Sequence, residues 1–401
     1  MQRRRKQSLS MQSLRIALED GCMKIAVLNR IFSKKAGGAE RYSVALVEEL
    51  AAKHEIHVFA QDISHSWPGV TYHRVSAPLR HSRWLNQLWY ATATWWHTRS
   101  GFDIVHSHEN TWHGNVQTVH VLPNKHNLFS GKTGWKKAKA WLKVITSPRL
   151  LAYLALEKRR FATQAGRHIV VTSPSLQGIF QAAYPGCQNP ISIITPGVSK
   201  ADWGYDKAAA KRVFGLAEDA FVIAFVGNRY DIKGLPTLLQ SFKALPEHVN
   251  LLAVGNAEQI GIYQAQTEKL GITQRVQFLG AMDSVDEVYQ AADALVHPTL
   301  EDTFAMVVLE AMSYGLPVVV SCEKYCGIAG LLTNGLNASI LEEPKNAVAL
   351  AERLRQLTNS ADDSKDLRKK LGSEALKFAS SYAWTQIARQ QLFLYEKIIK
   401  K

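Results

Sequence analysis

The feature of this sequence that most constrains its fold is a repeated alternation of short β-rich runs with longer helical segments. In the first half of the chain, strands are predicted at 24–29, 55–60, 102–108 and 166–173, and helices at 39–52, 83–99, 149–165 and 174–184. Strands that are joined through helices pair in parallel, because each crossover returns the chain to the same edge of the sheet. We therefore expect a parallel sheet with helices on both faces.

The alternation stops at ITPGVSKADWGYD, residues 194–206, where Pro and Gly cluster, and then it starts again. Further strands are predicted at 221–227, 249–255, 276–280, 293–298 and 316–321, with helices between them. The sequence thus predicts an α/β fold of two doubly wound, Rossmann-like domains, 23–198 and 199–381, which face each other across a ligand-binding cleft. Residues 382–401 are expected to form a helix that either caps the second domain or crosses back to the first.

The composition is that of a globular protein, since 46% of the 401 residues are apolar and 20% are charged. Four scattered cysteines are too few for a disulfide framework, and buried thiols explain Cys322 and Cys326 better than a metal site. Residues 1–22 begin with basic residues but lack the apolar stretch of a secretory signal, so we expect a disordered tail or an over-extended start. No apolar run approaches the roughly 18 residues of a membrane-spanning helix. A cytoplasmic protein is expected.

Positive charge is concentrated in the first half of the chain. The net charge is +14, and between Ile63 and Leu156 eleven Lys and Arg residues occur with only two acids, Asp103 and Glu109. This balance predicts an anionic partner, which could be nucleic acid, a membrane surface or a phosphorylated substrate. The alternative is a basic face that is simply solvated.

Two segments of this basic region, 84–99 and 131–143, combine aromatic with basic residues. Such segments suit an anionic bilayer surface, whereas no signature of a nucleic-acid-binding module is present. The aromatic residues at 84–96 could instead be core residues of a helix, but 131–143 carries too many lysines for a core. We therefore expect a peripheral protein at the inner face of the cytoplasmic membrane, without a nucleic acid partner.

The stretch LEDTFAMVVLEAMSYGLPVVVS, residues 300–321, places Glu301, Asp302 and Glu310 in or beside an apolar run. A buried carboxylate is costly unless it binds something. A helix is predicted from Phe304, directly after a strand, and the amides at its start form an anion site. Glu310, about two turns into this helix, would accept hydrogen bonds from sugar hydroxyls, while Asp302 either contacts the ligand or caps the helix.

Two glycine-containing loops follow other predicted strands. The loop VGNRYDIKG, residues 226–234, carries Arg229 and Lys233, and two cations at the C-terminal end of a strand suit a diphosphate. Gly37 and Gly38 follow the first strand, where the backbone can approach a ligand closely. A nicotinamide-dependent dehydrogenase would also have glycines at this place, but its G-x-G-x-x-G pattern is absent.

Together these segments resemble the retaining, nucleotide-sugar-dependent glycosyltransferases of family 4, which have the GT-B fold. The resemblance runs from Met23 through nearly the whole chain, and its motifs are AGGAERYSVALVEEL, DIVHSH, TVH, ITPGVS, GNRYDIKG, FLGAM, DTFAMVVLEAMSYGLPVVVS and the helix of Trp384. It implies that the C-terminal helix crosses back to the first domain. It also implies that neither a metal nor a further cofactor is needed, because the fold neutralises phosphate with protein cations.

The resemblance assigns a role to each candidate residue. Glu310 would bind the donor ribose, Asp302 and His120 would reach the transferred sugar, and Lys233 and Arg229 would bind the diphosphate. The other implied donor-binding positions are Gly37, Gly38, Gly227, Asn228, Gly280, Ala281, Thr303, Phe304 and Ala305.

The sequence departs from the family pattern at three positions. Asp302 occupies the place of the usual Glu, and Glu301, one residue out of register, is expected to face solvent. Ala305 replaces the usual Gly before the helix, and Asn228 replaces the usual Arg, which follows one position later as Arg229.

The predicted function is the transfer of a sugar, with retention of configuration, from a nucleotide-diphosphate sugar to an anionic glycan acceptor that is lipid-linked or at the cell surface. Segment 131–143 resembles the acceptor-side face of enzymes that extend lipopolysaccharide cores. Two alternatives remain at this point: a non-catalytic sugar-nucleotide-binding protein of the same fold, and a nicotinamide-dependent Rossmann enzyme.

Overall fold

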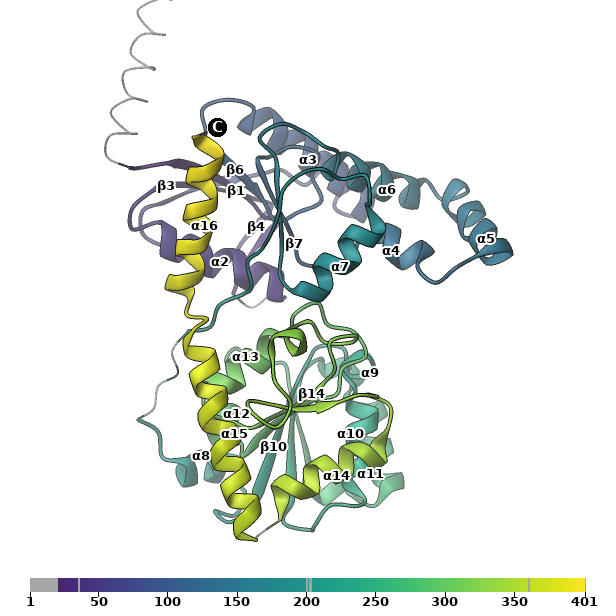
Figure 1. Ribbon diagram of the computed structural model, residues 1–401, viewed down its shortest axis with the longest axis vertical. Helices are drawn as coiled ribbons and strands as arrows, with labels where there is room; N and C mark the ends of the chain where they lie inside the picture. The colour runs from purple at the N-terminus through teal and green to yellow at the C-terminus, as the bar shows by residue number, and fades with distance from the viewer. Residues whose placement is uncertain (1–20, 35–36, 200, 202–203, 360, 401) are drawn as a thin grey trace, which may run out of the picture. The chain divides into compact units, whose positions relative to one another are not determined.

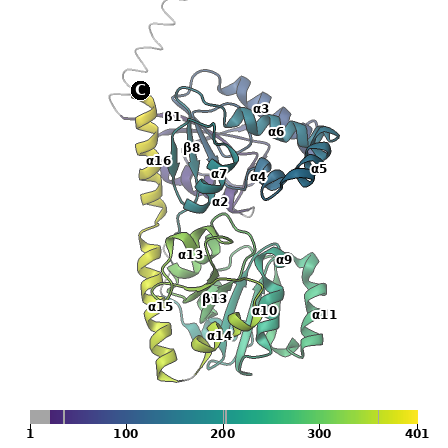
Figure 2. The ribbon, with the colours of Figure 1, turned by 45° about the vertical axis from the view of Figure 1, so that its right-hand side comes forward.

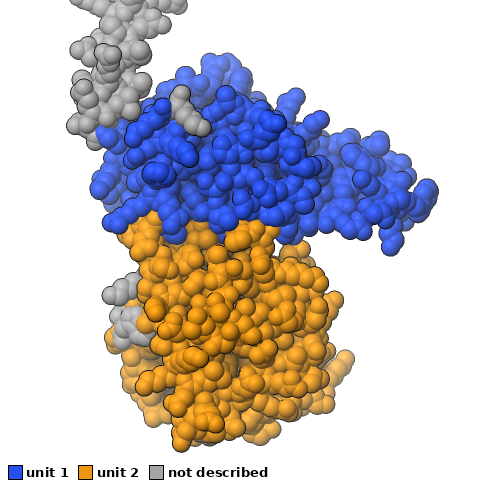
Figure 3. All heavy atoms as spheres, viewed as in Figure 1, with its two compact units in different colours: residues 1–172, 176–194, 387–401 blue, residues 173–175, 195–386 orange. Residues whose placement is uncertain are grey.

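The computed structural model of the protein describes residues 21–34, 37–199, 201, 204–359 and 361–400. Residues 1–20, most of the segment predicted to be a tail or an over-extended start, lie outside the described residues. The chain forms two compact units, which Figure 3 shows in different colours. Unit 1 comprises 1–172, 176–194 and 387–401, and unit 2 comprises 173–175 and 195–386.

Unit 1 contains a parallel seven-stranded sheet in the order β5-β3-β1-β6-β7-β8-β9. Its strands are β1 (Lys24–Leu28), β3 (Glu55–Ala60), β5 (Val70–Arg74), β6 (Ile104–Ser107), β7 (Val116–Val119), β8 (His168–Val171) and β9 (Ile191–Ile193). Two short strands, β2 (Ile31–Phe32) and β4 (Asp62–Ile63), pair separately. Parallel pairing brings the carboxyl ends of β6 and β7 to one edge of the sheet, and this places the residues that follow them side by side.

Helices lie on both faces of this sheet (Figures 1 and 2). They are α2 (Gly38–Leu50), α3 (Arg83–Thr98), α4 (Asn124–Phe129), α5 (Gly134–Ile145), α6 (Pro148–Arg160) and α7 (Pro174–Ala183). The C-terminal helix α16 (Trp384–Ile399) belongs to unit 1 from Ile387 onward. In Figures 1 and 2 this part of α16 lies beside α2, and α4 and α5 project from the body of unit 1.

Unit 2 contains a parallel six-stranded sheet in the order β12-β11-β10-β13-β14-β15. Its strands are β10 (Phe221–Val226), β11 (Val249–Val254), β12 (Val276–Gly280), β13 (Ala294–His297), β14 (Val318–Ser321) and β15 (Ser339–Leu341). Its helices are α8 (Lys207–Val213), α9 (Tyr230–Lys233), α10 (Leu235–Phe242), α11 (Ile260–Leu270), α12 (Asp286–Ala291), α13 (Met306–Ser313), α14 (Ala347–Thr358) and α15 (Asp362–Ser380).

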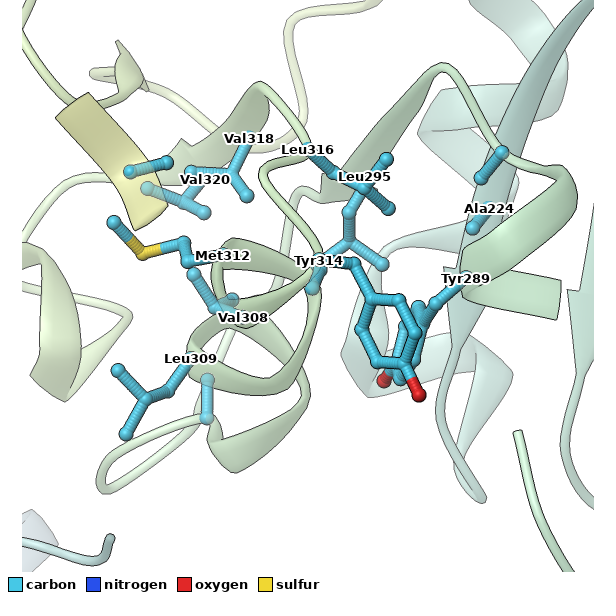
Figure 4. Close-up of a cluster of buried hydrophobic side chains, with 14 of the residues drawn as sticks. Ala224, Tyr289, Leu295, Val308, Leu309, Met312, Tyr314, Leu316, Val318 and Val320 are labelled. Carbon is cyan, nitrogen blue, oxygen red and sulfur yellow. The ribbon is translucent and has the colours of Figure 1, made fainter. Parts of the chain in front are cut away.

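The central strands of unit 2, β10, β11, β13 and β14, are largely apolar because they are covered on both faces. In β10, Val222 and Ala224 join a buried cluster with α13, while Ile223 and Phe225 join another cluster with α10. Figure 4 shows the first cluster, in which Val308, Leu309 and Met312 of α13 pack near Val318 and Val320 of β14. This packing fixes α13 on the sheet and so fixes the position of the loop before it.

The predicted fold of two doubly wound parallel sheets is confirmed. Strand β5 was not predicted, because an edge strand exposed on one side lacks the continuous apolar run by which the other strands were recognised. Helix α5 was not predicted either, since nearly all of its residues, lysines included, are exposed.

Candidate functional site

The loop between β13 and α13 presents Asp302 at the carboxyl edge of the sheet of unit 2. Its Oδ1 accepts hydrogen bonds from the backbone N–H groups of Phe304 (3.2 Å) and Ala305 (2.7 Å). Its Oδ2 accepts a hydrogen bond from Lys233 Nζ at 2.5 Å and lies 3.3 Å from Nε2 of His297. Asp302 therefore braces the loop before α13 and in addition holds a cation from a different loop. It does not cap the helix, an alternative that the sequence allowed, because the N-cap is Ala305 and has no side-chain cap hydrogen bond.

Lys233 at the end of α9 joins the two segments that the sequence singled out. Its Nζ donates both to Asp302 and to the backbone oxygen of Glu301, at 3.1 Å. The two loops are also linked by a backbone hydrogen bond of 2.7 Å from Leu300 N to Ile232 O. The side chain of Glu301 is exposed, as predicted. The cationic loop and the acidic loop thus form one continuous site.

Two glycines allow Lys233 to take this path. A Cβ atom on Gly227 would lie 2.7 Å from Cγ of Lys233. A Cβ atom on Gly234 would lie only 1.9 Å from the backbone oxygen of Pro298, and Gly234 also has a φ of +85°. Only glycine fits at these two positions, so part of the glycine pattern in the loop serves to place the lysine.

The charges of Asp302 and Lys233 balance each other, and His297 beside them is neutral. Burial by itself would raise the pKa of Asp302, but the hydrogen bond with His297 and the charge of Lys233 outweigh burial and hold the pKa below its usual range. Burial lowers the pKa of His297 despite the opposing effect of Asp302. His297 is therefore neutral at neutral pH, and because its Nε2 faces a carboxylate, its proton is on that nitrogen. The result is a preformed ion pair of Lys233 and Asp302.

Ala305 is the one residue other than glycine with positive φ among those that the structure describes, with φ 71° and ψ 70°. This left-handed conformation costs an alanine about 1 kcal/mol. It explains why the resembling family usually has Gly here. The N–H groups of Phe304 and Ala305 were expected to bind phosphate, but in this structure both donate to Asp302. The backbone of Thr303 packs tightly against Gly327, since a Cβ atom on Gly327 would lie 1.9 Å from the backbone oxygen of Thr303.

A tyrosine hydroxyl orients the carboxylate of Glu310, which lies on α13. The hydroxyl of the buried Tyr289 donates to Oε2 of Glu310 at 3.1 Å. The neighbouring Tyr314 donates to Oδ1 of Asp286 at 2.8 Å instead. Figure 4 shows the two tyrosine rings next to each other, with ring centroids 5.4 Å apart. Glu310 itself is partly exposed, so its carboxylate is held on one side and remains accessible to a ligand.

The other residues predicted for donor binding in unit 2 lie at the ends of strands β10 and β12 or directly after them. Arg229 has 63% of its side chain exposed and pairs with Asp231 at 3.0 Å rather than with the acidic loop. Asn228 and Ala281 are exposed. Gly280 has a φ of +70° and accepts a backbone hydrogen bond from Gly255 at 2.9 Å.

Unit 1 contains a cluster of three histidines where β6 and β7 end. Nδ1 of His108 lies 2.9 Å from Nε2 of His120, and the ring centroids of His106 and His108 are 4.2 Å apart. The hydroxyl of Tyr395, on α16, lies 2.6 Å from Nδ1 of His106. The C-terminal helix therefore contributes directly to the cluster that contains His120. Tyr42 of α2 packs edge-on against His120, with ring centroids 5.0 Å apart.

The three histidines are neutral at physiological pH. Burial, together with His120 and Arg160, lowers the pKa of His106 to about 3. Burial and Arg160 lower the pKa of His120 to about 3 as well. The pKa of His108 lies well below its usual value for the same reasons. A neutral imidazole can both donate and accept a hydrogen bond, which suits contact with a sugar hydroxyl.

Gly37 and Gly38 lie at the start of α2 in unit 1, and both are exposed. Gly37 is the N-cap of the helix, with extended backbone (φ −72°, ψ −179°) that does not itself require glycine. A Cβ atom here would meet only the flexible side chain of Glu40, with its nearest oxygen at 2.9 Å. Neither the backbone conformation nor rigid packing within the described residues requires a glycine at this position.

Helix α5 exposes large apolar side chains among its lysines. The exposed fractions are 82% for Trp135, 47% for Trp141, and 63% for both Leu142 and Ile145. In segment 84–99 the outcome is mixed, because Tyr90 is fully buried and Trp84 is half-buried, while Trp89, Trp95 and Trp96 are exposed.

Sequence reasoning missed three residues that hold the site together: His297, Tyr289 and Tyr395. The signal for His297 was weak but present, since a histidine in the apolar run DALVHP requires a polar partner when buried. Tyr289 and Tyr395 carried no signal, because their partners Glu310 and His106 are distant in the sequence and are found only in the fold.

No group of three or more His, Cys, Asp and Glu side chains in the described part of the chain is arranged to hold a metal ion. None of the helices formed by the described residues has the length and apolar character to cross a membrane.

Two protein-family models match consecutive parts of the chain. The model described as "Glycosyltransferase Family 4" matches residues 36–201, and the model "Glycosyl transferases group 1" matches residues 206–378. D-inositol 3-phosphate glycosyltransferase from Corynebacterium urealyticum is 28% identical over 310 residues, which are 69% of this chain and 71% of that protein. Lipopolysaccharide glucosyltransferase WaaG from Escherichia coli is 28% identical over 232 residues, 55% of this chain and 61% of that protein.

Solved structures share the fold over almost the entire length. The crystal structure of WaaG superposes with a TM-score of 0.78 at 21% identity, covering 92% of this chain and 98% of that one. Anabaena HepE in complex with UDP-glucose gives a TM-score of 0.71 at 19% identity, covering 94% and 100% of the two chains. The arrangement of two parallel α/β sheets is therefore the GT-B fold.

Proposed function

Because the chain belongs to the family 4 glycosyltransferases, which use nucleotide sugars, we propose that it transfers a hexose to a lipid-linked or cell-surface glycan, in the biosynthesis of lipopolysaccharide or a related polysaccharide. Its relatives include an enzyme named for inositol phosphate and one named for lipopolysaccharide. The strongly basic first half favours an anionic acceptor in either case.

The observation that carries the proposal is the ion pair of Lys233 and Asp302. Asp302 lies in the loop directly before α13, and Glu310 lies on α13 itself. In the proposed arrangement Glu310 accepts hydrogen bonds from the donor ribose and Lys233 binds the diphosphate. Asp302 lies near the transferred sugar, and the exposed Arg229 supplies a second cation once it leaves Asp231. These placements follow the family pattern, and their support here is the contact of the two loops.

The proposed reaction exchanges one glycosidic bond for another. The bond from the anomeric carbon to the diphosphate oxygen breaks as the acceptor oxygen bonds to the same face of that carbon, so configuration is retained. The acceptor proton passes to the departing phosphate oxygen. Lys233 stabilises the charge that develops on that phosphate, and electrostatic stabilisation of this kind is commonly the largest contribution to catalysis. His120 in its neutral form would hold a hydroxyl of the transferred sugar.

We propose that α5 contacts an anionic bilayer, at the inner face of the cytoplasmic membrane. Its exposed Trp135, Leu142 and Ile145 alternate with lysines, which suits insertion of apolar side chains between anionic headgroups. Helices α4 and α5 project from the sheet of unit 1, so α5 is free to reach a surface (Figure 1).

A donor panel tests the proposed function. Purified protein is incubated with UDP-, GDP- and ADP-linked hexoses without acceptor, and slow release of nucleoside diphosphate is measured. We expect release from one donor, and loss of this release in Lys233→Ala. Tight binding of one donor without hydrolysis, and without transfer to deacylated lipopolysaccharide core or inositol phosphate, would favour the non-catalytic alternative.

Liposome flotation tests the membrane contact separately. The triple variant Lys136→Glu, Lys137→Glu, Lys139→Glu should bind anionic vesicles less well, because each lysine near such a surface contributes roughly 1 kcal/mol. Glu substitutions at the exposed Lys365, Lys369 and Lys370 of α15 are the matched control. Equal loss in both variants would show general charge attraction rather than docking through α5.

A further inference from the structure

A pocket of about 430 Å³ lies between α3 and the segment that ends β5 in unit 1. Its lining includes Trp89, Trp96 and His97 from α3, and Arg74 and Ser76 from the end of β5. We call it the tryptophan pocket. None of these residues belongs to the donor site or to the histidine cluster.

The two indoles of the pocket are exposed but held in place. The indole N–H of Trp89 donates to the backbone oxygen of Ser76 at 3.0 Å and lies 3.2 Å from the Ser76 hydroxyl. The guanidinium of Arg99 stacks 3.7 Å from the ring centroid of Trp96 and covers one face of that indole. Trp89 is 39% exposed and Trp96 is 57% exposed. Large apolar surfaces that are exposed and rigid are typical of binding sites.

The stretch of chain that forms the pocket is basic. No Asp or Glu occurs between Ile63 and Phe102, whereas Arg74, Arg80, Arg83 and Arg99 all lie in this stretch. A ligand here meets aromatic faces, hydroxyl groups and guanidinium groups, but no carboxylate from this stretch. Arginine is the side chain best suited to bind phosphate or carboxylate through two hydrogen bonds.

We propose that the tryptophan pocket binds a sugar unit that carries a phosphate or carboxylate group. The apolar C–H face of a pyranose ring would stack on Trp96, its hydroxyls would bond to Ser76 and Thr92, and its anionic group would pair with Arg74. A concave site with rigid rings and hydrogen-bonding groups suits one sugar better than it suits a bilayer. The proposal gives segment 84–99 a different role from α5, although the sequence predicted a membrane contact for both.

The place of the pocket in the sheet indicates which sugar it would hold. Strands β5 and β6 are separated by three strand spacings in the order β5-β3-β1-β6, which is roughly 14 Å. That is longer than a single sugar ring, so the pocket would bind a remote sugar of an extended acceptor while its reacting end lies near the histidine cluster. This acceptor role rests on the proposed function, whereas the binding of an anionic sugar does not.

Ligand-observed NMR titration tests the binding directly, with glucose 6-phosphate, glucose and inorganic phosphate as probes. We expect glucose 6-phosphate to bind more tightly than either of the others. Trp96→Ala and Arg74→Ala should each weaken this binding at least roughly fivefold, while Trp96→Tyr, which keeps an aromatic ring, should restore most of it. Trp67→Ala is the matched control, because Trp67 is 41% exposed and does not line the pocket.

Three outcomes would overturn the proposal: no binding of glucose 6-phosphate, binding that Trp96→Ala leaves unchanged, or equal binding of glucose and glucose 6-phosphate. Weaker flotation of Trp96→Ala with anionic vesicles, without any change in sugar binding, would identify a bilayer contact instead. Hydrolysis of the nucleotide sugar should continue in all these variants. If the wild-type protein hydrolyses no nucleotide sugar, the proposed function is refuted, but the proposal for the tryptophan pocket still stands.

Discussion

The ammonium group of Lys233 lies 2.5 Å from Oδ2 of Asp302, although 68 residues separate the two in the sequence. Their side chains are only 21% and 17% exposed, so water screens this pair less than it screens a surface pair. The lysine is therefore held in position by the protein itself, and in the proposed role little side-chain entropy would be lost when it binds a diphosphate.

Lys233→Ala should lower turnover at saturating donor by on the order of a hundredfold, because in the proposed reaction it removes the charge that stabilises the departing diphosphate. Steady-state rates with saturating donor measure this. Arg229→Ala, at a 63% exposed residue paired with Asp231, is the comparison and should have a smaller effect. Near-normal turnover of Lys233→Ala would remove the diphosphate role from this residue.

Asp302→Asn and Asp302→Ala should separate the two roles of this side chain. An asparagine oxygen can still accept from the N–H groups of Phe304 and Ala305, so Asp302→Asn loses the charge alone, and turnover should fall without loss of affinity for free nucleoside diphosphate. Asp302→Ala also removes this acceptor, which should cost about 1 kcal/mol more in the free energy of unfolding. Calorimetric titration and thermal unfolding measure both effects. Normal turnover of Asp302→Asn would leave this side chain only its role in bracing the loop before α13.

Tyr289→Phe should weaken the binding of free nucleoside diphosphate several-fold, since Glu310 loses the hydrogen bond that orients its carboxylate. Tyr314→Phe is the matched control: it removes a hydroxyl from the adjacent ring, but that hydroxyl binds Asp286. If both variants lose affinity equally, the effect comes from packing of the tyrosine pair and not from Glu310.

Ala305→Gly should raise the free energy of unfolding by up to about 1 kcal/mol, because glycine adopts a φ of +71° without strain. The greater freedom of glycine in the unfolded chain offsets part of this gain. Ala311→Gly, within the buried side of α13, should instead destabilise the protein by about 1 kcal/mol. A lower melting temperature for Ala305→Gly would contradict this explanation of the family's glycine.

The histidine cluster predicts a loss of stability on acidification. His106 and His120 have pKa values of about 3 in the folded protein and about 6.5 when unfolded, so between these values the unfolded chain binds more protons. Their stabilisation is complete above about pH 6.5 and is lost as pH falls toward 3, with a slope of up to about 1.4 kcal/mol per pH unit for each histidine.

Urea unfolding at several pH values between 4 and 7.5 measures this slope. His106→Asn should lower the slope by the share of one histidine, whereas His81→Asn, at an exposed position, serves as the control. An unchanged slope in His106→Asn would mean that acid destabilisation arises elsewhere.

Much of this protein could be predicted from the sequence alone. The apolar runs 221–227 and 249–255 identified buried parallel strands, because only strands covered on both faces are apolar throughout. Gly227 and Lys233 lie within one loop, so local spacing alone brought them to the candidate site. The roles of His120, Glu310 and Asp302 came from the family pattern and not from the spacing.

What only the tertiary structure decided were the pairings between distant segments. Lys233 meets Asp302 because parallel strands bring the segments after β10 and β13 to one edge of the sheet. Tyr289 meets Glu310, and Tyr395 meets His106, because helices pack against each other and against the sheets. Local sequence patterns do not specify any of these pairings. The strain at Ala305 is likewise invisible in the sequence, since a backbone dihedral angle depends on what the packed helix and Asp302 impose. The sequence determined which groups the protein has, and long-range packing determined which of them act together.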